Sequence, residues 1–178
     1  MLCENGFGYF WSDQQIQHEK HFLDIFVQRL KDQYIQDWLT ILNTSSKLYS
    51  YRQYKNEILH EPYLNCITVR KFRHSLAKLR CSSHDLEIET GRYHNIAKEN
   101  RICKLCYSSV ETEFHFVLVC EKLADIREKY IPRKYYTNTN PHKYIILMRS
   151  SSEHILQNLG MYVFYAFQKR KELLASAP

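Results

Sequence analysis

Three cysteines and one histidine gathered in a short stretch constrain this chain more than any other feature. They follow the pattern C-x2-C, eight residues, then H-x4-C in the segment CKLCYSSVETEFHFVLVC, at Cys103, Cys106, His115 and Cys120. Three thiols and one imidazole complete the four-ligand tetrahedral set that structural zinc sites use. The sequence therefore predicts one structural zinc ion, held in the loop that these four residues span.

A disulfide or a redox motif accounts for the cluster less well than a metal does. A disulfide needs oxidising surroundings, and the N-terminus lacks the charged and apolar regions of a signal peptide. A redox C-x-x-C would follow a strand and open a helix, without a paired H-x4-C downstream. Buried cysteines beside a core histidine are the remaining alternative. The complete set of four favours a metal, and zinc is the usual metal for it, although another soft divalent ion has the same ligand preference.

Composition favours long helices around a real core. Of the 178 residues, 44% are hydrophobic and only four are Gly and four Pro. No run approaches the roughly 18 apolar residues that indicate a membrane span. We expect a mainly α fold, an irregular helical domain with an embedded C-x2-C-x8-H-x4-C loop. We also expect an intracellular protein of the nucleus or cytoplasm, with no membrane partner.

The expected organisation has three parts that pack as one compact unit. Residues 1–99 form a helical region with a basic helix near 63–80, residues 100–131 form the zinc-binding segment, and residues 132–178 form C-terminal helices. Residues at three- and four-residue steps predict one buried helix face: Phe22, Ile25, Phe26, Leu30, Tyr34, Trp38, Ile41 and Leu42. Further helices are predicted over 47–59, 63–80, 114–130 with a break near Cys120, 142–149 and 155–174, with an extended piece at 86–89.

The positive charge is unevenly distributed. Residues 47–104 hold twelve Lys and Arg against six Asp and Glu, so the whole formal net charge of +6 falls in this stretch. Basic helix faces bind phosphates by releasing counterions, and nearby tyrosines can stack on unpaired bases. A solvated helix face is the alternative. We predict nucleic-acid contacts, RNA or DNA, from these residues: Arg70, Lys71, Arg73, Lys78, Arg80, Arg92 and Arg101.

Signals for catalysis are weak. The chain contains no Gly-rich phosphate loop, no H-E-x-x-H and no G-x-S-x-G motif. Cys81 and His84 could form a nucleophile and its base, but no residue that would orient the histidine can be assigned. An incidental polar loop is favoured there, and we predict no enzymatic activity.

Several residues around the cysteine cluster resemble a known family. Arg101, Cys103, Cys106, Glu111, Glu113, His115, Phe116, Cys120 and Arg127 are similar to the C-terminal zinc-binding (CCHC) segment of non-LTR (LINE-type) retrotransposon reverse transcriptases. The upstream stretches 72–80 and 82–92 are similar to the sequence that precedes this motif in the invertebrate, mollusc-like branch of the family. Glu121 departs from the pattern, since relatives often have Pro after the last cysteine.

The resemblance implies a zinc- and nucleic-acid-binding module without the polymerase and endonuclease parts. In that family the region is thought to help hold template RNA or target DNA. The remainder of a polymerase-type polyprotein would be a protein partner. The alternative is a helical protein-interaction module whose zinc is purely structural. The sequence leaves the oligomeric state open.

Overall fold

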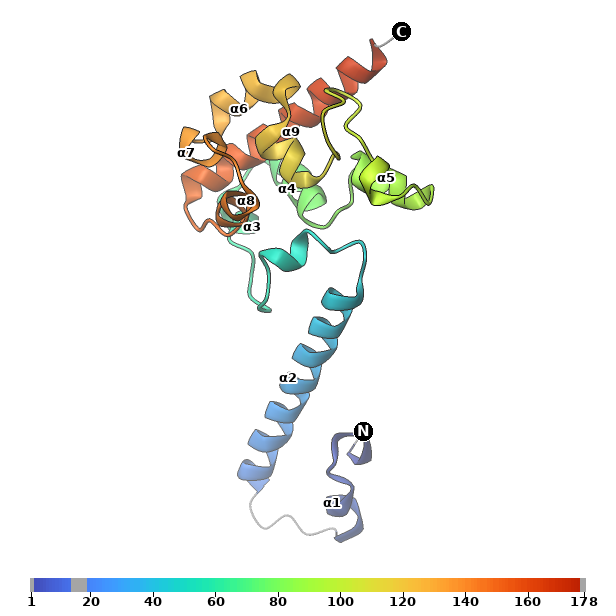
Figure 1. Cartoon of the computed structure of the whole chain (residues 1–178). Helices are drawn as coiled ribbons and strands as arrows, with labels where there is room; N and C mark the ends of the chain where they lie inside the picture. The colour runs from blue at the N-terminus through green and yellow to red at the C-terminus, as the bar shows by residue number, and fades with distance from the viewer. Residues whose placement is uncertain (1, 14–18, 177–178) are drawn as a thin grey trace. The chain divides into compact units, whose positions relative to one another are not determined.

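The chain forms two compact units, Met1–Ser45 and Ser46–Pro178, in a computed structural model that describes residues 2–13 and 19–176 (Figure 1). Regular structure within these described ranges is helical, and the β pairing there is a single antiparallel bridge between Ile102 and Val110. The predicted mainly α fold with an embedded Cys/His loop is therefore confirmed. The Cys/His loop belongs to the second unit.

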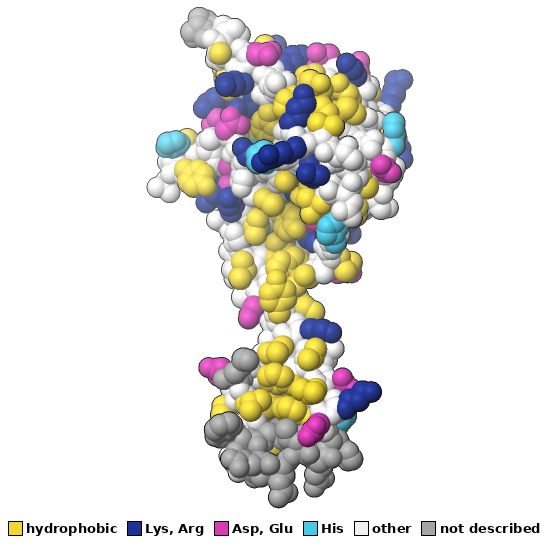
Figure 2. Space-filling model, turned by 180° about the vertical axis from the view of Figure 1, so that it is seen from behind, with side chains coloured by type: hydrophobic (Ala, Val, Ile, Leu, Met, Phe, Trp, Pro, Cys, Tyr) yellow, Lys and Arg dark blue, Asp and Glu magenta, His cyan; other side chains and the backbone are white. Residues whose placement is uncertain are grey.

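The first unit contains a 3-10 turn at Cys3–Asn5, α1 (Gly8–Asp13) and the long α2 (Glu19–Thr44). The predicted helix over 22–42 is confirmed, but the prediction that one of its faces is buried is wrong. Of the eight residues, Leu42 alone is buried, whereas Ile25, Leu30, Tyr34 and Ile41 are exposed. Figure 2 shows hydrophobic side chains along this helix. No described helix is both long and apolar enough to cross a bilayer.

The second unit is built around its last helix. α9 packs against α3, α4 and α6, and its buried residues Leu159, Tyr162 and Val163 join Leu76 and Leu79 of α4 in the core. The helices predicted over 142–149 and 155–174 are confirmed, with small differences at their ends. The helices of this unit are α3 (Tyr63–Cys66), α4 (Arg70–Arg80), α5 (Glu87–Tyr93), α6 (Ala124–Tyr130), α7 (Arg133–Tyr136), α8 (Pro141–Met148) and α9 (Glu153–Ala175).

The basic helix is shorter than predicted, because the chain breaks between α3 and α4. Ile67 and Val69 adopt extended backbone angles, and the carbonyl freed at Ile67 accepts a hydrogen bond of 3.1 Å from Arg73 Nη1. The break lets this linker lie directly on α9 at Gly160. A Cβ atom there would come within 2.9 Å of Ile67 Cδ1, so a larger residue would force the end of this side chain to shift.

Two further local predictions are wrong. Residues 47–59 form turns with a 3-10 piece at Tyr51–Gln53 rather than a helix, because the Tyr54 ring is buried against Tyr144. Residues 86–89 begin α5 rather than an extended segment. Acidic residues suit the first turn of a helix, and the backbone N–H of Glu87 donates to the Glu111 carboxylate at 2.8 Å.

Candidate metal centre

The four predicted ligands converge on one point. The ligand atoms of Cys103, Cys106, His115 and Cys120 all lie within 4.8 Å of one another. Cys103 Sγ lies 4.0 Å from Cys120 Sγ, and Cys106 Sγ lies 3.3 Å from His115 Nε2. Donors at zinc bond lengths in a tetrahedron are separated by about 3.4–3.8 Å. The cluster is therefore compatible with one tetrahedrally bound metal ion.

A tight turn supplies the first two ligands. The bridge between Ile102 and Val110 pins the two ends of the loop, and the Cys103 N–H donates to the Ser109 carbonyl at 2.9 Å. Inside the loop the Tyr107 N–H donates to the Cys103 carbonyl at 2.9 Å. Tyr107 has a φ of 56°, in the left-handed region that a tyrosine rarely adopts. This turn directs the thiols of the C-x2-C pair to the same side.

A π-helical turn supplies the other two ligands. His115–Val119 is π-helical, and the Cys120 N–H donates to the His115 carbonyl at 2.8 Å, five residues back. Thr112 starts this turn, because its Oγ1 accepts from the His115 N–H at 3.1 Å. In a π-helix, residues five apart lie nearly one above the other. The H-x4-C spacing and the wide turn thus bring the imidazole and the last thiol to one face.

Buried side chains stabilise the end of the π-helical turn. Arg127 is 5% exposed, and it donates to the carbonyls of Val117 at 2.9 Å and Cys120 at 2.6 Å. Tyr162 of α9 donates to the Phe116 carbonyl at 2.6 Å. Carbonyl groups buried without partners would cost free energy. Arg127 and Tyr162 therefore hold the backbone that carries the last ligand.

The imidazole is oriented by a second hydrogen bond. His115 Nδ1 lies 2.8 Å from Ser109 Oγ, while Nε2 faces the Cys106 thiol. A proton on Nδ1, donated to the hydroxyl, leaves the Nε2 lone pair free for a metal. Partners of this kind orient metal-bound histidines in many proteins.

Replacing Ser109 by alanine should weaken metal binding without unfolding the protein. Loss of such a partner typically costs about 10- to 100-fold in metal affinity. Ser109 is exposed, so the stability of the second unit should stay nearly unchanged. Competition with a chromogenic chelator measures the affinity, and Ser83→Ala, another exposed serine, is the matched control. Equal affinities of the two variants and the unaltered protein would contradict this role.

A buried ion pair lies directly behind the cluster. The Glu111 carboxylate, 1% exposed, accepts from Arg170 Nε at 2.8 Å and from Nη2 at 2.9 Å. Cys103 Sγ lies 3.6 Å from Glu111 Oε1. Arg170 also lies near Asp85 and Glu87, so one guanidinium serves three carboxylates. The pair connects the loop of the first two ligands to α9.

A hydrogen bond between the two buried thiols shifts their pKa values in opposite directions. The hydrogen bond to Cys120, with burial, raises the pKa of Cys103 to about 12, while the same hydrogen bond lowers the pKa of Cys120. The distance between their sulfur atoms is about twice that of a disulfide bond, and all six cysteines are free. The arrangement is not that of a disulfide and is compatible with separate metal ligands.

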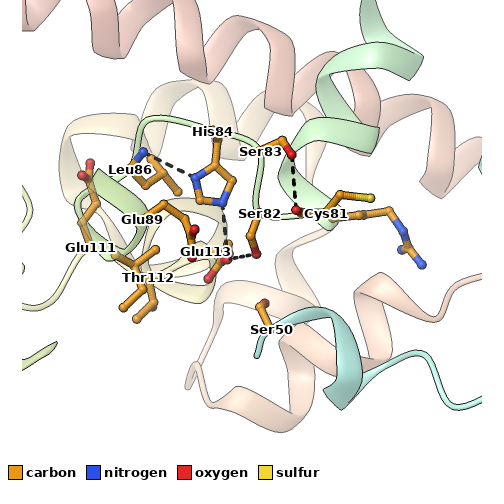
Figure 3. Close-up of polar contacts among 12 residues, drawn as sticks. Ser50, Cys81, Ser82, Ser83, His84, Leu86, Glu89, Glu111, Thr112 and Glu113 are labelled. Carbon is orange, nitrogen blue, oxygen red and sulfur yellow. Dashed lines mark hydrogen bonds and ion pairs between the residues drawn. The ribbon is translucent and has the colours of Figure 1, made fainter. Parts of the chain in front are cut away.

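The alternative catalytic pair, Cys81 and His84, is not assembled. His84 Nε2 lies 3.3 Å from Glu113 Oε1, which also accepts from the Ser82 hydroxyl at 3.0 Å. Figure 3 shows the Cys81 thiol directed away from the imidazole. Partial burial raises the pKa of Cys81, which disfavours the thiolate that a nucleophile needs.

The seven predicted nucleic-acid contacts fall into three groups, which are exposed, buried and half-buried. Arg70, Lys71 and Lys78 are exposed on α4. Arg80 is only 3% exposed; it donates to the Met148 carbonyl and pairs with Glu61 at 2.7 Å. It therefore serves the core and is removed from the predicted contact set.

The other three arginines are half-buried and already engaged. Arg73 donates to the carbonyls of Leu64 in α3 and Ile67 in the α3–α4 linker. Arg92 pairs with Glu89 at 2.8 Å. Arg101 donates to the carbonyls of Ile96 and Ile88. These three side chains stabilise local structure, so a surface role falls mainly to the exposed residues of α4.

Sequence reasoning missed most of the residues that support the metal ligands. The resemblance included Glu111, Glu113 and Arg127 but assigned them no role, and neither Ser109 nor Arg170 was singled out. Their signal is weak, because isolated polar residues in apolar stretches indicate burial but do not indicate a partner. Arg170 follows its partner Glu111 by 59 residues.

No family model, curated protein or solved structure matches this chain.

Proposed function

We propose that this chain is a nucleic-acid-binding module whose binding surface is held in place by one structural zinc ion. The convergence of three thiols and one imidazole is the observation that carries the proposal. Zinc is the metal that best suits this donor set, because three sulfur ligands and one nitrogen are typical of its closed structural sites. All four positions are protein ligands, so the metal would have a structural rather than a catalytic role. Such a role agrees with the resemblance to the C-terminal segment of retrotransposon reverse transcriptases.

The proposed binding surface lies on α4 and the adjoining part of α9. Lys71, His74 and Lys78 recur at three- and four-residue steps and therefore share one face of α4. Lys171 of α9 lines the same cavity as His74 and Lys78. Lysine side chains on such a surface can neutralise phosphates without reading sequence. The excess positive charge of residues 47–104 supports the same interpretation.

Reversing two charges on α4 should weaken nucleic-acid binding. Arg70→Glu with Lys78→Glu should lower affinity at least about tenfold. The slope of log affinity against log salt concentration should become shallower by about 0.7–0.9 for each phosphate that is no longer neutralised. Both residues are exposed, so stability should change little. Fluorescence anisotropy with labelled RNA and DNA, titrated over a range of salt concentrations, measures both effects.

The matched control is Arg133→Glu with Lys134→Glu, which makes the same charge change at exposed positions of α7. It should alter the binding less than the α4 variant does. Equal losses in the two variants would indicate a general charge effect rather than a binding surface. Absence of binding by the unaltered protein even at low salt would overturn the proposed function.

A helical protein-interaction module is the second candidate. The exposed apolar residues of α2, among them Leu23, Val27 and Leu30, are the observation that favours it. In that case the zinc would be purely structural, and no salt-sensitive nucleic-acid binding would be found. The remainder of a polymerase-type polyprotein would be the corresponding partner.

A further inference from the structure

A cavity of about 480 Å³ lies between α4, α9 and the loop that follows α4. Its volume falls within the range of about 300–1,000 Å³ that small-molecule sites occupy. Phe164 and Phe167 of α9 form its apolar wall, and Lys78, Lys171 and His74 contribute basic groups. Aromatic rings and cations are thus combined in a space large enough for one nucleotide.

The aromatic wall is held rigid from behind. Phe167 stacks on the buried Phe116 with ring centres 4.5 Å apart, and Phe164 meets Phe72 edge to face at 5.4 Å. Lys71 Nζ lies 4.8 Å from the centre of the Phe164 ring, which continues the positive charge along α4. Rings fixed in this way lose little side-chain entropy when another ring stacks on them.

The His84 ring, which also lines the cavity, is fixed as well. The His84 side chain is 1% exposed, and its two nitrogens lie near the Leu86 N–H and the Glu113 carboxylate, at 3.4 and 3.3 Å (Figure 3). The ring centres of His84 and Phe167 lie 6.2 Å apart, with 32° between the ring planes. Because both nitrogens are occupied, His84 contributes a ring wall rather than a free donor.

The charge balance of the cavity favours an anionic group on the ligand. Among the described residues that line it, Asp85 is the acidic one, and it lies 3.4 Å from Arg170, which offsets its charge. Lys78 and Lys171 are exposed lining residues that can reach a phosphate. Gln168 and Ser75 add polar groups that can contact the edge of a base.

We propose that this cavity binds one unpaired nucleobase of single-stranded nucleic acid, with Lys78 and Lys171 on the adjacent phosphate. The inference rests on the proposed function and makes it more specific, because a duplex keeps the faces of its bases stacked and out of reach. Stacking of a base on an aromatic side chain contributes about 1–3 kcal/mol, or about 5- to 150-fold in affinity.

Two variants test the cavity. Phe164→Leu removes one stacking ring, and Ser75→Leu fills the cavity from α4 without changing charge or rings. Each should lower the affinity for a mixed-sequence single-stranded RNA by about 5-fold or more and leave binding to a duplex of the same length unchanged. Thermal unfolding checks that each variant is folded, and Ser151→Leu, at an exposed position outside the cavity lining, is the control. In the unaltered protein, 5-iodouridine in the RNA should photo-crosslink to Phe164 or Phe167, as mapped by mass spectrometry.

The outcomes distinguish a failure of the cavity site from a failure of the proposed function. Equal binding of single strands and duplexes, with neither folded variant impaired, would overturn the cavity site and leave the proposed function standing. Failure of the unaltered protein to bind either nucleic acid at low salt would overturn both. Binding of a phosphotyrosine peptide that is abolished in Ser75→Leu, without single-strand preference, would assign the cavity to a protein ligand and overturn the inference.

Discussion

Replacing Cys106 by serine is expected to reduce the metal content of the purified protein from one ion per chain to nearly none. Cys106 is one of four converging ligands, and a hydroxyl is a poor substitute for a thiolate at zinc. The effect on affinity should exceed the roughly 10- to 100-fold loss that follows when a ligand keeps the metal but loses its hydrogen-bond partner. Native mass spectrometry and elemental analysis give the stoichiometry.

Loss of the metal should also lower stability. Apparent binding free energies of about 10–16 kcal/mol for structural zinc show how strongly metal binding couples to folding. Thermal unfolding of the unaltered protein should therefore shift to lower temperature with a chelator, and Cys106→Ser should unfold early with or without it. Cys81→Ser, which lies outside the cluster, should keep both metal and stability. A metal content near zero in the unaltered protein would refute the metal centre.

Replacing Arg170 by methionine is the second change for which we expect a large effect. The Glu111 carboxylate would remain buried without its bidentate partner, and breaking one side of a buried pair costs about 3–5 kcal/mol. The replacement keeps most of the apolar stem of the side chain, so the loss reports the charge rather than the packing. Urea unfolding followed by circular dichroism measures the free energy of unfolding.

Two controls isolate the pair. Lys169 lies on the same helix as Arg170 and forms a surface ion pair with Asp125 of α6. Lys169→Met breaks this pair and should cost less than about 1 kcal/mol. Adding Glu111→Gln to Arg170→Met removes the unpaired charge and keeps an acceptor for the Glu87 N–H, so part of the loss should be recovered. If Arg170→Met were no more destabilising than Lys169→Met, the pair would have no special role.

Local patterns predicted the elements that depend on neighbouring residues. The long helices α2 and α9 followed from apolar spacing, and the break near Cys120 coincides with the end of the π-helical turn. Predictions were wrong where distant contacts decided the conformation. At α5, Glu111 binds the first backbone N–H, and at residues 47–59 the burial of Tyr54 takes the place of a helix.

The sequence by itself determined the identity of the metal-ligand candidates. C-x2-C and H-x4-C each place two donors within one turn of backbone, so their convergence is largely a local matter. Only the tertiary structure decided which basic residues reach the surface and what lies behind the cluster. Arg80 and Lys78 differ by two positions on α4, yet one is buried and the other exposed. Burial and long-range pairing depend on how α9 packs, because α9 brings Arg170, Phe164 and Phe167 beside segments far away in the chain.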